Sequence, residues 1–298
     1  MALILSVLEQ GLIYGVMALG VYITYKILDF PDLTVDGSFP MGAAIAAVMI
    51  TDEVSPFLTL AASFLAGTAA GILTGIIHVK LKVRDLLSGI IMMTALYTVN
   101  LRITGKANVP LYNKATIFEN NWTERFLKGA LEPFGTLLVI AVIVVLLKYL
   151  LDWYLSTRSG YLLRAVGDND TLVTSMGVDR GIIKIIGLAI ANGLVALSGC
   201  LFAQQQRFFD ISMGTGTVVI GLASVIIGTS LLKKAALLRV TSSVVIGSVL
   251  YKACVALALR YMKVINLQSK DLKLVTSLLF LLILIAAQER KKKVKNNA

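Results

Sequence analysis

The chain has 298 residues, of which 57% are apolar and only 15% are charged. Ordinary soluble domains carry roughly 25% charged residues, so the composition excludes a soluble globular enzyme or binding domain as the body of the chain. The net charge of +11 does not indicate a nucleic-acid partner, because the basic residues cluster at the ends of apolar segments, as they do in cytoplasmic loops of membrane proteins.

Apolar segments follow one another along the whole sequence. Two of them, 54–77 and 185–206, carry no charge and exceed the about 18–20 residues that cross a bilayer. The N-terminal MALILSVLEQ lacks a basic region and a cleavage site, so we expect a retained spanning helix there. The sequence predicts an all-α polytopic transmembrane helix bundle with about eight or nine hydrophobic segments. They are roughly 3–26, 38–51, 55–79, 86–103, 134–152, 183–204, 215–232, 240–260 and 274–288.

The basic residues predict which loops face the cytoplasm, because an excess of Lys and Arg marks that side. The clusters are Lys80/Lys82/Arg84, Arg158/Arg164/Arg180/Lys184, Lys233/Lys234/Arg239 and the basic tail 289–298. Loop 105–133, where Glu119, Glu124 and Glu132 offset the basic residues, then lies outside. The N-terminus lies outside if every segment spans, and inside if 38–51 is a half-helix that turns back.

Residues for catalysis or metal binding are scarce. Cys200 and Cys254 both fall in apolar segments, and His78 is the only histidine, so we expect no disulfide framework, metal site or cofactor in this chain. A Walker-type glycine loop is absent from the sequence, so this chain cannot hydrolyse ATP by that route. An intramembrane enzyme that uses Ser248 and Lys252, four apart on one helix face, is a remote alternative.

Glycines recur every four residues in two of the segments. Gly67, Gly71 and Gly75 share one face of the third segment, and Gly11 and Gly15 share a face of the first. Small residues at this spacing let helix backbones approach one another in lipid. We expect these two faces to pack against neighbouring helices rather than to contact substrate.

Two short polar stretches resemble each other and interrupt the apolar pattern. Asp32-Leu33-Thr34-Val35-Asp36-Gly37-Ser38 and Asp210-Ile211-Ser212-Met213-Gly214-Thr215-Gly216 both place an acid and a hydroxyl before a small-residue helix. Matching interruptions in each half are typical of inverted repeats, whose broken helices line a substrate path. We expect one transmembrane domain, 1–298, with half-repeats of about 1–150 and 155–288.

Polar side chains inside these segments are the candidates for the substrate pathway. Asp32 and Asp210 are expected above all to cap or brace the interruptions, with direct substrate contact as the alternative. Lys252, near the middle of the eighth segment, needs an acid partner, water or a shorter span. Thr94 and Asn100 either face the pathway or bond a neighbouring helix. The complete set is Asp32, Thr34, Asp36, Ser38, Thr94, Asn100, Asp210, Ser212 and Lys252.

The loop 155–182 is the longest cytoplasmic connection. Asp168, Asn169 and Asp170 give helix-start signals, and Gly177 is a stop signal, so a helix of under two turns is expected up to Met176. Such a helix, flanked by arginines, suits docking of a soluble partner, although an ordinary loop with a turn explains the composition equally well.

Several motifs resemble a known family. Thr157-Arg158-x-Gly160, Arg164-Ala165-x-Gly167-x-Asn169 and Gly177-Val178 resemble the cytoplasmic signature of branched-chain amino acid and ribose type permeases of ABC importers. Asp32-Leu33-Thr34-Val35 resembles a stretch of the sugar members, and 81–111 looks like a subgroup associated with tryptophan or tyrosine uptake. Asp36-Gly37 departs from the Gly-Ser of the sugar members, which argues against a sugar and leaves an amino acid or another small zwitterion as the substrate.

The resemblance implies a multi-subunit transporter in the plasma membrane of a bacterium. Two permease copies form the pathway, cytoplasmic ATP-binding cassette ATPases bind ATP, and an extracytoplasmic binding protein delivers an aromatic or branched-chain amino acid. The resemblance also implies that the loop around 169–176 is the coupling helix that docks on the ATPase. The coupling residues would be Arg164, Gly167, Asn169, Thr171, Met176 and Gly177.

An ion-coupled secondary carrier of a small polar metabolite is the main alternative. Such carriers also use inverted repeats and broken helices. The carrier would need an ion-coupling site, for which Asp32, Asp36 and Asp210 are the attractive carboxylates.

Overall fold

The computed structural model describes residues 2–112, 114–119, 134–231 and 239–262, together with 274, 276–278 and 280–285. Several residues of the topology prediction lie outside the described residues: Glu124, Glu132, Lys233, Lys234 and the tail 289–298. The ninth predicted segment, 274–288, is described only in part.

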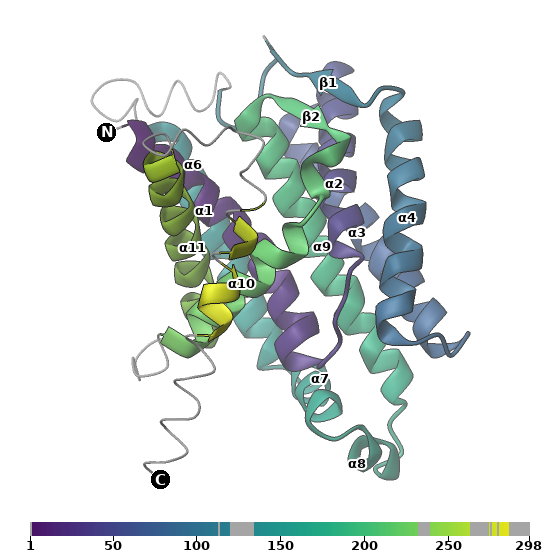
Figure 1. Ribbon diagram of the computed structural model, residues 1–298. Helices are drawn as coiled ribbons and strands as arrows, with labels where there is room; N and C mark the ends of the chain where they lie inside the picture. Colours follow the sequence, from purple (N-terminus) through teal and green to yellow (C-terminus); the bar gives the residue numbers. More distant parts are fainter. Residues whose placement is uncertain are drawn as a thin grey trace.

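Helices make up almost all of the described chain (Figure 1). The helices are α1 (Ala2–Val21), the π-helix η1 (Tyr22–Ile27), α2 (Val35–Thr51), α3 (Pro56–Val79), α4 (Asp85–Thr104), α6 (Gly135–Leu155), α7 (Arg158–Asp168), α8 (Asp170–Ser175), α9 (Arg180–Gln206), the 3₁₀ helix η3 (Ile211–Gly214), α10 (Thr217–Leu231) and α11 (Val240–Met262). Strands β1 (Asn108–Pro110) and β2 (Phe208–Asp210) pair antiparallel. Seven helices in the described part are long and apolar enough to cross a membrane, which confirms the all-α polytopic bundle.

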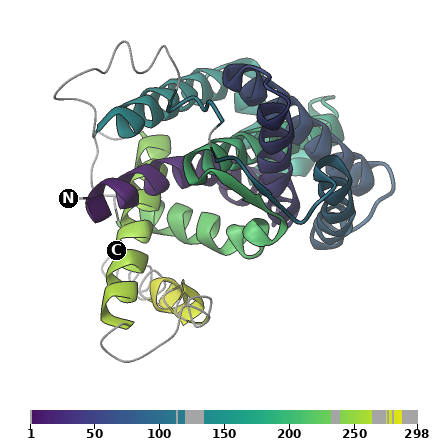
Figure 2. The same cartoon turned by 90° about the horizontal axis from the view of Figure 1, so that it is seen from above.

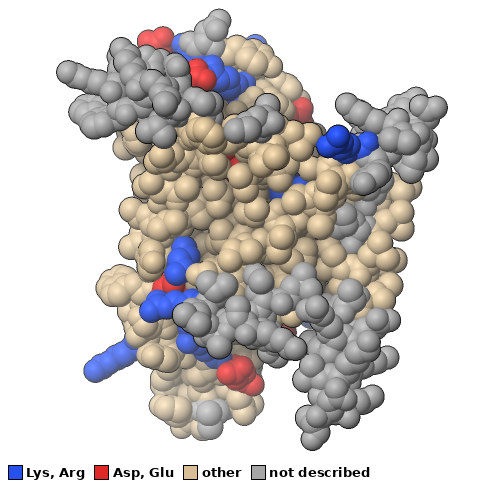
Figure 3. All heavy atoms as spheres, turned by 90° about the vertical axis from the view of Figure 1, so that its left-hand side faces the viewer, with Lys and Arg blue, Asp and Glu red and all other residues tan. Residues whose placement is uncertain are grey.

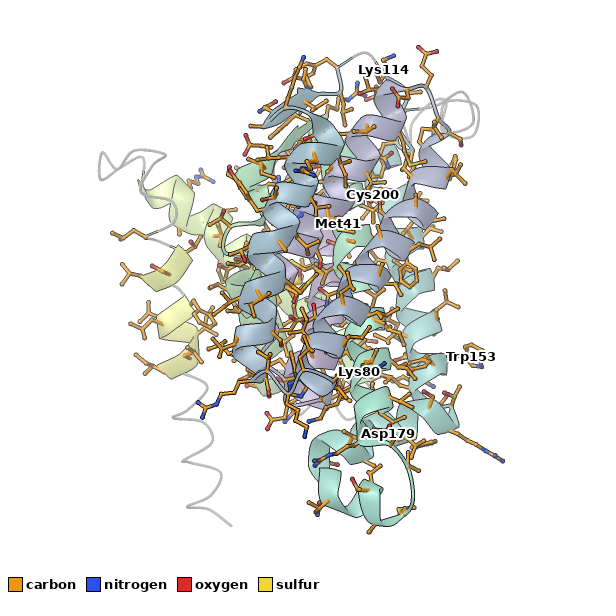
Figure 4. All side chains as sticks on the ribbon, turned by 90° about the vertical axis from the view of Figure 1, so that its right-hand side faces the viewer. Met41, Lys80, Lys114, Trp153, Asp179 and Cys200 are labelled. Carbon is orange, nitrogen blue, oxygen red and sulfur yellow. The ribbon has the colours of Figure 1, made fainter. Side chains whose placement is uncertain are left out.

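The two ends of the bundle carry different elements. The β1–β2 pair lies at one end and α7 and α8 lie at the other (Figure 1). Lys114 lies at the first end, whereas Lys80 and Asp179 lie toward the second (Figure 4). Between the ends most of the visible surface is uncharged (Figure 3). Because basic loops stay in the cytoplasm, we call the α7–α8 end the cytoplasmic end and the β1–β2 end the outer end.

The path of α1 and α2 places the start of the chain. α1 begins at the outer end and descends, and η1 continues it to the cytoplasmic end (Figure 1). α2 then runs back to the outer end and does not turn toward the cytoplasm. With the ends assigned from the basic residues, α1 starts outside.

α9 is the central helix of the bundle (Figure 2). Of its 27 residues 18 are buried, compared with 6 of the 21 residues of α6 at the periphery. α9 can be central because small residues let its neighbours approach its backbone. A methyl group added to Gly42 of α2 would meet the carbonyl of Ala196, and one added to Gly71 of α3 would meet the carbonyl of Leu188.

The two predicted glycine faces are both packing faces. Gly71 and its neighbours on α3 lie against α9, and Gly11 and Gly15 of α1 lie against Val249 and Val245 of α11. The expectation that these glycines serve helix contact is confirmed.

Both predicted interruptions break a helix. η1 leads into an irregular segment, 28–34, in which Asp29 has a φ of 52°. After α9 the chain turns at Arg207, forms β2 and η3, and passes Gly216, with a φ of 85°, before α10 begins. Segment 28–34 enters from the cytoplasmic end and 208–216 enters from the outer end (Figure 1). The two interruptions therefore have opposite directions, while the half-repeat boundaries stay a prediction.

Gly71→Val tests the close contact between α3 and α9. We expect a cost of about 1–3 kcal/mol, because the larger side chain has to displace the α9 backbone. The melting temperature of the purified protein in detergent should fall by several degrees. Ala69→Val is the matched control, because Ala69 is exposed on the same helix. Equal melting of Gly71→Val and the unsubstituted protein would contradict the packing described here.

Candidate functional site

The first turns of α2 and α10 meet inside the bundle, and we call this meeting point the junction (residues 34–38 and 214–218). The Asp36 carboxylate of α2 accepts three hydrogen bonds from the start of α10. Its donors are the Gly216 amide at 2.9 Å, the Thr217 hydroxyl at 2.9 Å and the Val218 amide at 2.8 Å. The first amides of a helix have no partner within the helix. Asp36 therefore caps α10 across 180 residues of sequence, and its charge also suits the positive end of the helix dipole.

Glycines allow this close meeting. A methyl group on Gly214 would meet the backbone carbonyl of Asp36 and the ring of Pro40. The positive φ of Gly216 turns the chain from η3 into α10. Asn100 of α4 closes the other side, because its side-chain amide donates to the Gly37 carbonyl at 3.1 Å. The junction is thus held from α2, α4 and α10.

Asp32 belongs to a second buried network just before the junction. Its carboxylate accepts from the Asn192 side chain of α9 at 2.7 Å and from the Thr34 amide at 2.9 Å. Ser38 donates to the side-chain oxygen of Asn192 at 2.7 Å, and the hydroxyls of Thr34 and Thr74 lie 3.0 Å apart. A carboxylate inside a membrane protein needs such partners. The network joins segment 28–34 and α2 to α9 and α3.

Asp210 and Ser212 lie apart from the junction, toward the outer end. Asp210 caps η3 by accepting from the Ser212 amide at 2.8 Å and from its hydroxyl, and Asn108 of β1 donates to it at 3.4 Å. Partial burial acts to raise the pKa of Asp210, but these hydrogen bonds lower it, and the net direction is downward. The expected bracing role fits this geometry.

Two predicted pathway residues lie elsewhere. Thr94 is exposed on α4, and its hydroxyl bonds carbonyls of its own helix. The ammonium of Lys252 lies 3.8 Å from the ring centre of Tyr14. Neither residue is brought to the junction. Ser248 is fully buried and donates to the Gly11 carbonyl at 2.6 Å, so its hydroxyl serves helix packing.

The cytoplasmic end carries the expected short helix and a further one. α8 covers the predicted position within one residue, and Thr171 donates to the Asn169 side chain at 2.6 Å. Met176 is 69% exposed, and Gly177 ends the turn with a φ of 79°. α7 was not foreseen from the sequence.

α7 lies directly beneath the first interruption. A methyl group added to Gly167 would meet the carbonyl of Ile27, the last residue of the π-helix. Leu163 of α7 and Leu28 both pack against Gly187 of α9. Arg164 is exposed on α7. α7 is thus in direct contact with the segment that leads to the junction.

A buried ion cluster joins α6 to the start of α11. Asp152 pairs with Lys148 at 2.9 Å and with Arg239 at 3.4 Å, and it accepts from the Thr241 hydroxyl at 2.6 Å. Asp152 was not predicted as a functional residue, because it lies at the end of an apolar segment and resembles a loop residue. Asn192 was not predicted either, although an Asn inside an uncharged segment was a usable signal.

The arrangement has the features of a transport path. Within the described residues no group of His, Cys, Asp or Glu could hold a metal ion. The two broken helices, by contrast, meet inside a bundle of spanning helices, which is typical of substrate paths in transporters. Fold and site together define a membrane transport protein.

Comparisons with known proteins identify the family. The model of the branched-chain amino acid transport system permease component matches residues 3–287, so the chain belongs to this family. A tyrosine transport system permease protein of Clostridioides difficile (strain R20291) is 43% identical over 99% of this chain and 95% of its own length. An uncharacterized protein of Rickettsia prowazekii (strain Madrid E), RP368, is 34% identical over 76% of this chain and 77% of its own.

More distant relatives transport other solutes. The ribose import permease protein RbsC of Escherichia coli (strain K12) is 26% identical over 75% of this chain and 68% of its own length. No solved structure matches the chain. The family and the seven apolar helices make this chain a transport permease subunit and a multi-pass protein of the plasma membrane.

Asp36→Ala tests the cap at the junction. It removes a charged acceptor with three donors, and hydrogen bonds to charged groups are worth about 1.5–3 kcal/mol each. We expect the melting temperature to fall by at least several degrees, and Asp36→Asn to lose less, because an amide oxygen can still accept. Asp210→Ala, a half-buried cap at the outer end, is the control and should cost clearly less. A larger loss for Asp210→Ala would contradict the account.

A double-mutant cycle tests the Asp32 network. Asn192→Leu alone leaves the Asp32 carboxylate without its side-chain donor, and breaking a buried charged contact costs about 3–5 kcal/mol. Asp32→Leu combined with Asn192→Leu removes both groups, so the double variant should melt higher than the sum of the single losses predicts. Additive losses would show that the two side chains do not depend on each other.

Proposed function

We propose that this chain forms the membrane pathway of an ATP-driven importer of an amino acid with an aromatic or branched side chain, with tyrosine as the first substrate to test. The observation that carries the proposal is the 43% identity, over nearly the whole chain, with a tyrosine transport system permease. The departure of Asp36-Gly37 from the sugar pattern supports an amino acid over ribose.

The junction supports a path that opens alternately to the two sides. The interruptions enter from opposite ends, and Asp36 links the two short helices where they meet. In inverted-repeat transporters, parts of the bundle rock around such a point. In our proposal the linked starts of α2 and α10 form the pivot, and the residues of the pathway lie on both sides of it.

α7 and α8 support a route by which a cytoplasmic ATPase drives this motion. α8 would dock on the ATPase, and α7 would pass the displacement to Ile27 through its contact with Gly167. The π-helix suits a moving element, because single π-turns occur frequently at functional sites. The displaced segment 28–34 then acts on the junction through Asp32 and Asp36.

Membership of this family also supports the remaining partners of the proposal. Two permease copies would pack side by side in the bilayer, the ATPase would bind the cytoplasmic end, and a binding protein would deliver substrate at the outer end. ATP would be bound by the ATPase and by no residue of this chain.

The ion-coupled carrier is less well supported. An ion-coupling carboxylate has to release its protein partners to take up a proton or a cation. Asp36 holds three donors and Asp32 holds two, and these bonds tie helices together. Uptake that stops when an ionophore is added at constant ATP would favour the carrier instead.

A mild-detergent purification of the tagged chain tests the proposed assembly. We expect a stoichiometric ATPase and a second permease copy, and a purified complex that hydrolyses ATP. Co-purification of a solute-binding protein would support import, and its ligand can be screened with tyrosine, leucine and ribose. If the chain purifies alone and still transports in proteoliposomes, the proposal is wrong.

Met176→Glu tests the docking role of the α8 region. Met176 is 69% exposed beyond α8, and a charge there should weaken binding of the ATPase while leaving the melting temperature of the permease unchanged. We expect ATPase recovery in the purification to fall by about tenfold, since a mispaired charge in an apolar contact costs over 1.4 kcal/mol. Tyr112→Glu is the matched control, because Tyr112 is 66% exposed at the outer end. Equal recovery for both variants would place the docking surface elsewhere.

A further inference from the structure

Lys252 is a cation in the interior of a spanning helix. It is the thirteenth of the 23 residues of α11, roughly 18 Å from Val240 at 1.5 Å per residue. Within the described residues no carboxylate lies within 4.0 Å of its ammonium. Its partner there is the ring of Tyr14, 3.8 Å from the ring centre. The ring face offsets only part of the cost of a charge at this depth.

The candidate acids on neighbouring helices are already bound. Asp36 holds the start of α10, and Asp32 holds Asn192 and the Thr34 amide. Glu9 of α1 accepts from the Gln205 side chain at 3.0 Å. Of the alternatives for Lys252, pairing with one of the predicted acids is therefore not seen among the described residues. Within the described residues Lys252 therefore has no acidic partner, so its N–H donors are open to a ligand.

The surroundings of Lys252 connect it to the junction. Tyr14 stacks on Phe39 with ring centres 5.6 Å apart, and it meets Phe202 edge-on at 5.3 Å. Phe39 is three residues after Asp36 on α2. These contacts fix the Tyr14 ring, so they also fix the place where the ammonium lies. The ammonium of Lys252 thus lies against Tyr14, whose ring packs on Phe39 of α2, the helix that begins at the junction.

We propose that Lys252 binds the α-carboxylate of the amino acid as it moves through the membrane. The inference rests on the proposed function and adds the group of the substrate that is recognised. An ammonium on the face of a fixed aromatic ring keeps its remaining N–H donors for a carboxylate. A charge-assisted bond of this kind inside the bilayer discriminates between an amino acid and the amine that lacks the carboxylate.

Competition binding to the purified full-length permease in nanodiscs tests this role. The probe is radiolabelled L-tyrosine, with tyramine as the analogue without a carboxylate. The unsubstituted protein should bind tyrosine about 10- to 100-fold more tightly than tyramine, the range for one bond to a charged group. Lys252→Met should remove this difference by lowering the affinity for tyrosine alone, and Lys252→Arg should keep most of the difference. Cys254→Ser, exposed on the same helix, is the control.

The outcomes separate this inference from the proposed function. The carboxylate role is overturned if the Lys252→Met variant binds tyrosine with normal affinity. It is also overturned if the variant loses affinity for tyrosine and for tyramine by the same factor. If the Lys252→Met variant no longer forms the dimer of two permease copies but binds tyrosine as before, the ammonium serves contact with the second copy. That result also overturns the carboxylate role. ATP-driven uptake by the complete unsubstituted complex is measured separately. If that uptake occurs while Lys252→Met behaves normally, only the inference about Lys252 fails.

Discussion

The structure depends on one carboxylate that crosses between the two halves of the chain. Asp36, in the first turn of α2, binds two amides and one hydroxyl at the first turn of α10. Inside a membrane these amides have no water to bond, and each unpaired group would cost several kcal/mol. A helix can therefore begin in the middle of this bundle only because a residue 180 positions away supplies the acceptor. The same bonds therefore hold the second interruption in place.

The close packing of α9 makes this arrangement possible. Lipid gives helices no hydrophobic reason to associate, so close backbone contact and interhelical hydrogen bonds hold the bundle together. Gly42 and Gly71 bring α2 and α3 onto the backbone of α9, which places Asn192 within reach of Asp32 and Ser38. The polar network thus forms where small residues let the helices come closest. At the cytoplasmic end, the polar contacts of Asp152 likewise join two helices, α6 and α11.

Much of the architecture could be predicted from the sequence, because it follows from local patterns. Uncharged segments of sufficient length predict spanning helices, and the i, i+4 glycines predict which faces pack. The two similar polar stretches predicted both interruptions, and the signals around Asp168 and Gly177 predicted a short cytoplasmic helix. Each of these features has a local signal in the sequence, even where distant residues stabilise it, so it could be predicted directly.

Long-range partners could not be predicted in the same way. Nothing near Asp36 indicates that its donors are Gly216, Thr217 and Val218, because that pairing depends on how two distant helices dock. The same holds for Asn192 with Asp32. Thr94 was a plausible pathway residue by composition, but the rotation of α4 exposes it. α7 and the π-helix were missed because their positions are set by the contact between Gly167 and Ile27.

Uptake of radiolabelled L-tyrosine into proteoliposomes, with ATP hydrolysis measured in the same vesicles, tests the central claim most directly. The vesicles would contain the purified complex with either unsubstituted permease or Asp36→Asn, the milder change at the junction. We predict that the unsubstituted complex takes up tyrosine only with ATP. Asp36→Asn should lower uptake severalfold more than it lowers ATP hydrolysis, because the ATPase still docks but the pivot is weakened. Uptake that needs no ATP, or a normal ratio of uptake to hydrolysis in Asp36→Asn, would contradict the account.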